Sequence, residues 1–316
     1  MSSPAPTGEF AHVAALYASD EQLRGLLLPY LDEGLRRHEN ILAVISDDAR
    51  HVLYDALGEA ADRVKWGRPG VSNHRLSQMF EGYVAQQRQA GVPTRVIGEF
   101  DSDGVPHSGP DRVSQYLRYE SIANEVYARY GYPVVCLWDQ RRYPAELLAH
   151  VRAVHPQLLD TCGPITNAEY RIDYLTPDRS ASVDPELVVH LDSADDLGGL
   201  RRRLRRWSAG CGLADQDIDD IVIAVDEIAT NALEHGQPPA CVRGWTSPDA
   251  LFVQVEDQGR ISIPATTGDH RPSTDARRGR GIWMARHLAE VLTTHSGSAD
   301  TTVAMRFARP LGSRVS

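Results

Sequence analysis

The sequence predicts two domains, a three-layer α/β domain with a mostly parallel sheet and then an α+β sandwich with an antiparallel sheet. The first reason is that short apolar runs alternate with longer amphipathic segments between residues 10 and 156, which is typical of βαβ units. The second is a stretch at 157–184 that is rich in Pro, Ser, Thr and Asp and keeps no period. The third is that two consecutive helical segments precede a group of strands after residue 185. The expected boundaries are 9–157 for the first domain, 158–184 for the linker and 185–308 for the second domain.

The first half shows the alternation of helices and strands most clearly. Apolar residues at three- and four-residue intervals predict helices, and apolar runs of about four to eight residues predict buried strands. The expected helices are 20–37, 48–61, 75–91, 111–131 and 144–156. The expected strands are 40–46, 62–67, 93–100 and 132–139. Because helices separate the strands, these connections favour a mostly parallel sheet.

The second half combines helices with antiparallel strands. Ser193 is a candidate N-cap, and Gly236 ends a long amphipathic helix. Two apolar segments flank the turn residues Ser247 to Ala250 and predict a β-hairpin. The expected helices are 193–210, 214–236 and 281–292, and the expected strands are 186–191, 240–247, 250–259 and 301–307. This order favours helices on one face of an antiparallel sheet.

Composition and charge exclude several classes of protein. The 316 residues carry a net charge of −10, which argues against direct nucleic-acid binding because phosphate contacts need a surplus of basic groups. Lys65 is the only lysine, so the phosphate-binding motif G-x-x-x-x-G-K-[ST] is absent. No apolar run approaches the ~20 residues of a membrane span, and the N-terminal segment lacks the features of a signal peptide. We therefore expect a cytoplasmic protein that does not act on membranes.

The cysteines are widely spaced along the chain. They are Cys136, Cys162, Cys211 and Cys241, and they form no C-x-x-C pair. This spacing predicts neither a structural zinc site nor a disulfide framework. Each cysteine is expected to be a small buried hydrophobe.

The helix expected at 214–236 carries an unusual polar pair. Its apolar positions fall on one side, and Glu227 and Asn231 fall together on the other, because residues four apart share a helix face. A carboxylate and a carboxamide in one patch can hold a hydroxyl nucleophile and a hydrated Mg²⁺, which prefers oxygen ligands. An ordinary solvated helix face has the same pattern, and the segment by itself leaves both interpretations open.

Two later segments add polar and glycine positions. Asp257 and Gly259 follow an apolar strand, where the carboxylate can accept a hydrogen bond from an exocyclic amine and the glycine lets a flat ring approach. Gly279 and Gly281 precede a helix, where backbone N–H groups and the helix dipole favour phosphate. Each motif by itself also fits an ordinary turn.

Taken in order, the three motifs resemble those of a known superfamily. E-x-x-x-N on a helix, D-x-G after a strand and G-x-G before a helix are similar to the N, G1 and G2 boxes of the GHKL ATPases and kinases. The segment 185–308 has one long N-box helix and no phosphoacceptor helix, so it looks most like the anti-sigma-factor serine kinases. The resemblance implies a sandwich of the GHKL (Bergerat) type that binds ATP and Mg²⁺.

The resemblance also implies roles for the first two motifs. Glu227 matches the general base that activates a substrate serine or threonine, and Asn231 matches the ligand of the Mg²⁺ that bridges the phosphates. Asp257 matches the residue that binds the adenine amine, with Gly259 beneath the ring. The implied reaction is in-line phosphoryl transfer from ATP to a partner protein.

The third motif and the last strand supply the remaining positions. Gly279 and Gly281 match the lid and the phosphate-binding turn, and Arg277 stands where similar proteins carry an arginine that reaches the γ-phosphate. Thr301 or Thr302 matches a contact on the adenine side, with Thr302 preferred. Asp300 replaces the glycine that usually precedes these threonines, which puts this contact in doubt.

The first half resembles the MEDS sensory domain, named for methanogen and methylotroph regulators. The similarity lies in 12–46, in "RYE" at 118–120 and in "VVCLWD" at 134–139. It implies a RecA/KaiC-like fold without a P-loop, which agrees with the missing G-K-[ST]. The matching candidate positions for sensing a small molecule are His12, Tyr17, Glu120 and Cys136. The alternatives are that His12 and Tyr17 form a hydrogen-bonded core pair and that Cys136 is only buried.

These resemblances give one functional hypothesis with an alternative. The hypothesis is an anti-sigma regulatory factor with protein serine/threonine kinase activity, controlled by an N-terminal sensory domain. Its implied partners are a sigma factor, a STAS-type anti-anti-sigma protein and a small-molecule ligand, and the family tends to form homodimers. The alternative is a non-catalytic ATP-binding or ligand-sensing module that regulates transcription through partner switching.

Overall fold

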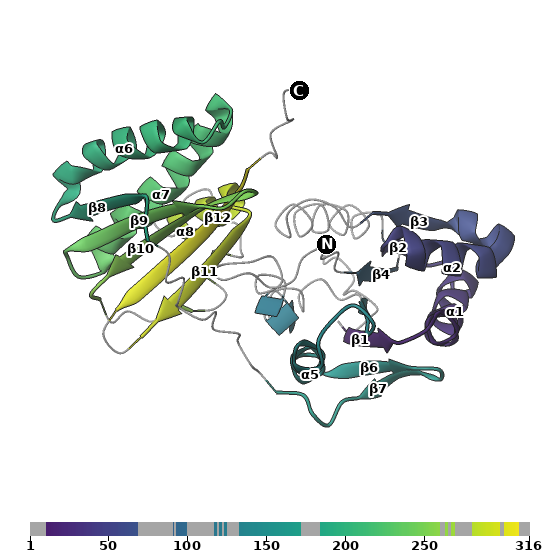
Figure 1. Ribbon diagram of the computed structural model, residues 1–316. Coiled ribbons are helices and arrows are strands. Elements are labelled where there is room, and N and C mark those ends of the chain that lie inside the picture. Colours follow the sequence, from purple (N-terminus) through teal and green to yellow (C-terminus); the bar gives the residue numbers. More distant parts are fainter. Residues whose placement is uncertain are drawn as a thin grey trace, which may run out of the picture. The chain divides into compact units, whose positions relative to one another are not determined.

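The computed structural model describes most of both halves of the chain (Figure 1). The described residues are 11–68, 91, 93–99, 117, 118, 120, 121, 123, 124, 133–171, 184–259, 263, 264, 267, 268, 280–297 and 300–309. The described residues up to 171 belong to one compact unit, and those from 184 onward belong to a second. Each unit has a sheet and a core of its own.

The first unit is built on a seven-stranded, mostly parallel sheet with the order β3-β2-β4-β5-β1-β6-β7. Every described pairing in it is parallel except that of β6 with β7. The strands are β1 His12–Tyr17, β2 Asn40–Val44, β3 Val64–Gly67, β4 Thr94–Glu99, β5 Val134–Asp139, β6 Gln157–Asp160 and β7 Gly163–Thr166. The predicted α/β class with a mostly parallel sheet is confirmed.

Two helices of this unit begin at serine caps. The Ser19 side chain accepts a hydrogen bond from the Gln22 N–H, and Ser46 accepts one from the Ala49 N–H, so both helix starts satisfy a free donor. One face of the first helix buries Leu23, Leu27 and Leu31, which pack in the core with strand residues. The helices whose bounds lie within the described residues are α1 Asp20–Arg36, α2 Asp47–Leu57 with the 3₁₀ turn Gly58–Arg63, and α5 Ala145–Val154.

Three strands of this unit were not expected from the sequence. β1 is apolar without alternation from Val13 to Leu16 and is buried on both faces, so it has no strand period that would distinguish it. β6 and β7 lie in the segment expected to be linker, and they extend the edge of the first sheet. Their side chains are mostly half-buried or exposed, so they form no apolar run.

The second unit is a five-stranded antiparallel sheet with the order β11-β12-β10-β9-β8. The strands are β8 Leu187–Leu191, β9 Ala240–Thr246, β10 Ala250–Asp257, β11 Val291–Ser296 and β12 Thr301–Ala308. The predicted hairpin corresponds to β9 and β10. β11 is a fourth strand that was not expected, because its apolar start continues the pattern of the preceding helix.

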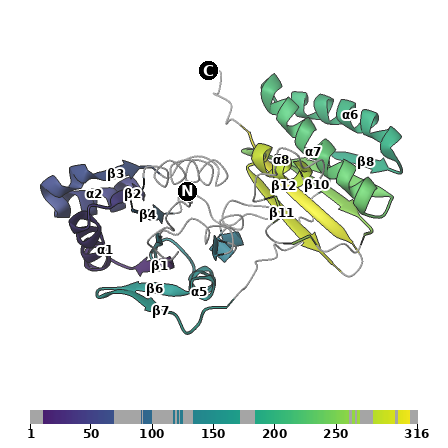
Figure 2. The ribbon, with the colours of Figure 1, turned by 180° about the vertical axis from the view of Figure 1, so that it is seen from behind.

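Helices cover one face of this second sheet (Figures 1 and 2). They are α6 Leu197–Gly210, preceded by the 3₁₀ turn Ala194–Asp196, α7 Asp215–His235 and α8 Arg280–Leu288. Ile221, Val225 and Ile228 of α7 pack against Val253 and Val255 of β10 in the shared core. The opposite, polar side of α7 is therefore turned away from the sheet, and the predicted α+β sandwich is confirmed.

None of the described helices combines the length and the apolar character that crossing a membrane requires.

Candidate functional site

The polar side of α7 carries Glu227 and Asn231 four residues apart, and both are half-buried. Burial raises the pKa of Glu227, and the neighbouring carboxylates of Asp226 and Glu234 raise it further. A carboxyl group with a raised pKa accepts a proton more readily than an exposed glutamate does. This environment suits the predicted role of Glu227 as a general base.

The first turn of α8 lies directly against this pair. A Cβ placed on Gly281 would lie 2.7 Å from Asn231 Nδ2 and 3.0 Å from Glu227 Oε2, so only a glycine leaves both side chains in place. The packing of α8 on α7 therefore brings the N-terminus of α8 to the two polar groups. Backbone N–H groups and the positive end of the helix dipole favour an anion such as phosphate at a helix N-terminus.

Asp257 ends β10 and is almost fully buried. Its Oδ1 accepts hydrogen bonds from the N–H groups of Gly259, at 2.6 Å, and Gln237, at 3.3 Å. A Cβ on Gly259 would lie 2.5 Å from the same oxygen and 2.9 Å from the Gly236 Cα. A Cβ on Gly236 would also collide with the Asp257 carboxylate. In the described part of the chain, both hydrogen bonds to Asp257 go to Oδ1, so Oδ2 can accept a further donor.

The two threonines of β12 lie on opposite faces of the sheet. Thr301 pairs with Asp257 in the ladder, and its hydroxyl donates to the Gly259 carbonyl at 2.9 Å. Thr302 pairs with Glu256 and His295, and because side chains alternate along a strand it points away from the helices. The structure therefore joins Thr301, rather than the preferred Thr302, to the Asp257 turn.

The remaining predicted nucleotide-site residues, Arg277 and Gly279, lie outside the described residues. Asp300 is described and directly precedes β12.

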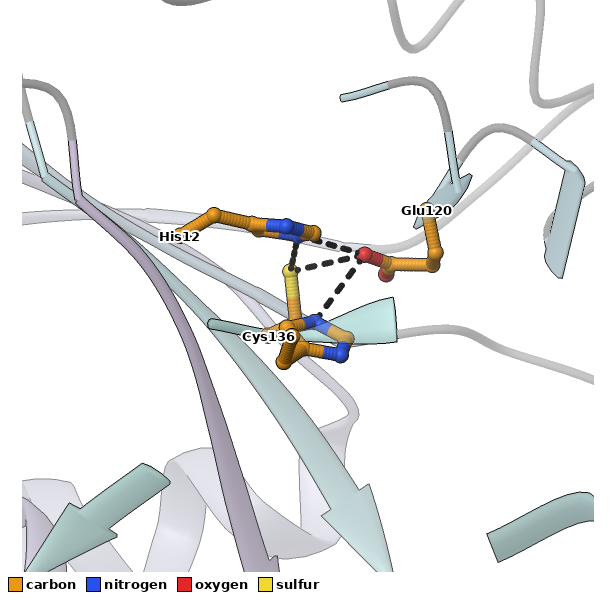
Figure 3. A group of neighbouring side chains, drawn as sticks. His12, Glu120 and Cys136 are labelled. Carbon is orange, nitrogen blue, oxygen red and sulfur yellow. Dashed lines mark hydrogen bonds and ion pairs between the residues drawn. The ribbon is translucent and has the colours of Figure 1, made fainter. Parts of the chain in front are cut away.

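In the first unit, three of the four predicted sensory residues come together (Figure 3). His12 of β1 and Cys136 of β5 share a sheet face, since Ala14 is the register partner of Cys136. His12 Nε2 lies 2.7 Å from Glu120 Oε2, and Cys136 Sγ lies 3.3 Å from that oxygen and 3.4 Å from His12 Nε2. Burial and the nearby His155 lower the pKa of His12 to about 4.

A fourth side chain, His155, joins this group and was not expected. It follows α5, its Nε2 lies 3.1 Å from Glu120 Oε2, and its ring centroid lies 4.0 Å from that of His12. Burial by itself raises the pKa of Glu120, but His155 and His12 outweigh that effect and bring the pKa below its usual value. The carboxylate is therefore charged although Glu120 is completely buried.

Tyr17, the fourth predicted sensory residue, lies apart from this cluster. Its hydroxyl donates to Glu99 Oε1 at 3.4 Å, while Glu99 Oε2 accepts from the backbone N–H and the hydroxyl of Ser46, at 2.7 and 2.6 Å. Five positions along a strand place His12 and Tyr17 on opposite faces, so the hydrogen-bonded pair considered as an alternative does not form. Burial raises the pKa of both Tyr17 and Glu99.

Comparison with known families agrees with these two arrangements. Residues 11–156 match the MEDS family, the methanogen/methylotroph, DcmR sensory domain. Residues 192–307 match the histidine kinase-like ATPase domain. The chain joins a MEDS sensory domain to a histidine kinase-like ATPase domain. Both resemblances stated from the sequence are thereby confirmed.

A solved structure is also similar to part of the chain. It contains the RsbU and RsbW domains of Rv1364c from Mycobacterium tuberculosis and shares 24% sequence identity with this chain, with a TM-score of 0.30. The match covers 40% of this chain and 34% of that one, so this chain spans about a third of its length.

Two contributions to these sites had no clear signal in the sequence. His155 of the MEDS domain joins its cluster only through the fold, since it lies far from the other members along the chain. In the ATPase domain, Gly236 was interpreted only as a helix end. Its second role, making room for Asp257, depends on where β10 ends in the sheet.

Proposed function

We propose that the ATPase domain binds Mg²⁺-ATP and transfers the γ-phosphoryl group to a serine or threonine of a partner protein. The observation that carries the proposal is the contact of Gly281 with Glu227 and Asn231. It joins a candidate base, a candidate metal ligand and a helix N-terminus that favours phosphate in one small region. Asn231 would hold the Mg²⁺, which neutralises charge on the phosphates, and Glu227 would orient and deprotonate the attacking hydroxyl.

The adenine end of the proposed site lies at Asp257. A buried carboxylate with one oxygen held by two N–H groups and the other available suits recognition of an exocyclic amine. The close approach of Gly259 and Gly236 keeps the turn narrow beside it. In this proposal the nucleotide extends from Asp257 toward the first turn of α8.

We further propose that the protein is an anti-sigma regulatory factor whose MEDS domain controls this activity in response to a small molecule. The proposed partners are a sigma factor and a STAS-type antagonist that is the phosphorylation substrate. This role rests on the similarity of the N, G1 and G2 boxes to those of anti-sigma kinases. The absence of a G-K-[ST] motif supports the assignment of nucleotide binding to the second domain rather than the first.

Calorimetry with ATP, with and without Mg²⁺, tests the binding step. Wild-type protein should bind ATP with micromolar affinity that depends on Mg²⁺, and Asp257→Asn should abolish the binding. Asp215→Asn, at an exposed position in the first turn of the same domain's α7, is the matched control and should bind normally. If wild-type protein does not bind ATP, the pocket is vestigial and the proposal is wrong.

Phosphoryl transfer needs a separate assay with labelled ATP and STAS-domain proteins from the same genome. Label on a serine or threonine of one of these proteins would support the kinase activity. Asn231→Ala should lose this label together with the Mg²⁺-dependent part of the ATP affinity. ATP binding without transfer to any of them would favour the alternative, a non-catalytic partner-switch module.

A further inference from the structure

The buried cluster in the MEDS domain contains four side chains that are all common metal ligands. His12, Glu120, Cys136 and His155 each offer one donor atom, and these four atoms all lie within 4.8 Å of one another. The relative exposure of the four residues is 1%, 0%, 5% and 0%, so solvent does not compete at the cluster. They come from β1, from the segment around residue 120, from β5 and from the end of α5.

The hydrogen bonds around His155 leave one contact unexplained. Its Nδ1 lies 2.7 Å from the Val151 carbonyl, which can only accept, so Nδ1 carries the proton. In the neutral ring, Nε2 then presents a lone pair to Glu120 Oε2, 3.1 Å away. Two acceptors at this distance repel each other unless a second proton or a metal ion lies at the contact.

The Glu120 carboxylate also has an oxygen whose hydrogen bonding is incomplete. Among the described residues, the buried Glu120 Oε1 has no hydrogen-bond partner, and the contact of His155 Nε2 is with Glu120 Oε2. Glu120 Oε2 instead has His12 Nε2, His155 Nε2 and Cys136 Sγ around it, at 2.7, 3.1 and 3.3 Å. Buried charge of this kind is tolerated in proteins when it is paired or when it coordinates a metal.

The separations are close to those of a tetrahedral zinc site. Zinc bonds of about 2.0–2.3 Å to nitrogen, oxygen and sulfur imply about 3.3–3.7 Å between neighbouring ligand atoms. Four of the six separations among the ligand atoms run from 2.7 to 3.4 Å. All six separations are within 4.8 Å, so shifts of up to about 1 Å would admit the ion.

We propose that His12, Glu120, Cys136 and His155 form a tetrahedral binding site for Zn²⁺ in the MEDS domain. Two imidazoles, a thiolate and a carboxylate suit Zn²⁺, whereas Mg²⁺ and Ca²⁺ prefer ligands that are all oxygen. When the ion binds, Cys136 loses its thiol proton to solvent and coordinates as the thiolate. With four protein ligands and no exposed face, the site has the closed form typical of structural zinc.

The surroundings hold the ligands in orientation. The Val151 carbonyl fixes the His155 tautomer, which is the usual arrangement around a metal-bound histidine. Near Glu120, the Asn124 amide donates to the Val154 carbonyl, which ties this segment to the end of α5. The ion would therefore link two strands, one helix end and the segment around residue 120.

The expectation from cysteine spacing, that no zinc site exists, considered only pairs of cysteines close in sequence. The proposed site uses one cysteine, and its ligands lie at positions up to 143 residues apart, from His12 to His155. No local motif marks such a site.

The test uses full-length protein without a metal-binding tag, reduced and treated with a chelator. Titration with Zn²⁺ against a chromophoric competitor should show about one ion per chain with a Kd below about 1 µM, as expected for a four-ligand zinc site. Co²⁺ should give the intense visible bands of tetrahedral coordination and a thiolate charge-transfer band in the ultraviolet.

Variants then separate this site from other metal-binding groups. Cys136→Ser should remove the charge-transfer band and weaken Zn²⁺ binding by at least about 100-fold, more than the loss of a supporting residue costs. Cys162→Ser, which changes the exposed thiol between β6 and β7, is the matched control and should leave both signals unchanged. Asn231→Ala should also retain them, which excludes the proposed Mg²⁺ site as the source.

Failure of wild-type protein to bind stoichiometric Zn²⁺ would overturn the proposal, and this result does not depend on whether any variant folds. Binding that survives in Cys136→Ser and in His155→Gln would overturn it as well. The cluster would then be held by a proton on His155 in place of a metal. ATP binding is measured independently, so either outcome leaves the proposed kinase function untouched.

Discussion

Glu227 shows how one residue's environment prepares it for chemistry. Half-burial and two neighbouring acids raise its pKa, so its charged form is less stable in the folded protein than in water. Because the folded-state pKa is raised, the ionised side chain lowers stability at pH values above that pKa. Catalysis requires this same ionised form, so function and stability make opposite demands on this side chain.

The variant Glu227→Gln tests the base assignment. The amide keeps the shape of the side chain but cannot accept a proton, so phosphoryl transfer should fall by about 10²–10⁴-fold. ATP affinity should stay within about threefold, because the nucleotide contacts are retained. Asp217→Asn, which changes an exposed carboxylate in the first turn of the same helix, should transfer normally. Loss of ATP binding in Glu227→Gln would contradict the assignment.

The same substitution has a second, pH-dependent consequence. At pH 7 the melting temperature of Glu227→Gln should equal or exceed that of wild type by up to about 2 °C, since the amide removes an unfavourable charge. Below about pH 4 the wild-type carboxyl is protonated and the difference should vanish. A lower melting temperature at pH 7 would show that the carboxylate stabilises the fold.

Gly281 offers a sharper test of the site's geometry. Gly281→Ala would push against the Asn231 and Glu227 side chains, so ATP affinity should fall by at least about tenfold while the fold is kept, because only side-chain ends are displaced. Gly199→Ala in α6 is the control, since its Cβ meets no atom within 4 Å and alanine favours helices. Equal ATP affinity in the two variants would show that the first turn of α8 is not part of the site.

At the scale of the elements, sequence periodicity predicted the helices well and some of the strands poorly. α1 and α7 have a clear apolar stripe and recognisable ends, so their limits were predicted to within a residue or two. β1 gave no strand period because both its faces are buried, and β11 was merged with a helix because its apolar start continues that helix's pattern. Local patterns report burial on one face, and they do not report which neighbouring element supplies it.

The candidate site residues also differ in whether a local motif marks them. Glu227, Asn231 and Asp257 stand in local motifs, so they were predicted. His155 was missed, because the contact that gives it a role joins it to residues far away in the sequence, as His12 is joined to Glu120 across 108 positions. A motif does not tell which face of a strand a residue occupies, so the sequence could not distinguish Thr301 from Thr302 by their positions in the sheet.

One buried arginine links the end of α1 to the sheet. Arg95 of β4 lies 2.5 Å from Glu39 Oε2, donates to the Tyr30 carbonyl at 2.6 Å, and stacks over the Tyr30 ring at 4.2 Å. Lysine has neither the fork of donors nor the flat face, so Arg95→Lys should destabilise the first unit by about 1–3 kcal/mol. Denaturant unfolding would measure this change, with the exposed Arg36→Lys as a control that should shift the midpoint little. A wild-type midpoint for Arg95→Lys would mean that helix packing alone holds α1.

At the scale of the whole molecule, two units with separate cores share one chain. All the described nucleotide-site residues belong to the second unit, and all four proposed zinc ligands belong to the first. Residues 184–316 expressed without the first unit should therefore fold and bind ATP with an affinity within about fivefold of the full chain. Circular dichroism and calorimetry would check this, and an unfolded or inactive fragment would show that the second unit depends on the first.

The fixed position of the Asp257 side chain has a consequence for the thermodynamics of ligand binding. Gly236 and Gly259 close around the carboxylate, and two backbone N–H groups hold Oδ1, so the side chain has a single rotamer before any ligand arrives. A ligand that donates to Oδ2 meets a preorganised acceptor. The entropy of immobilising a side chain at an interface, about 0.5–1.5 kcal/mol, is then lost during folding and is not lost again on binding.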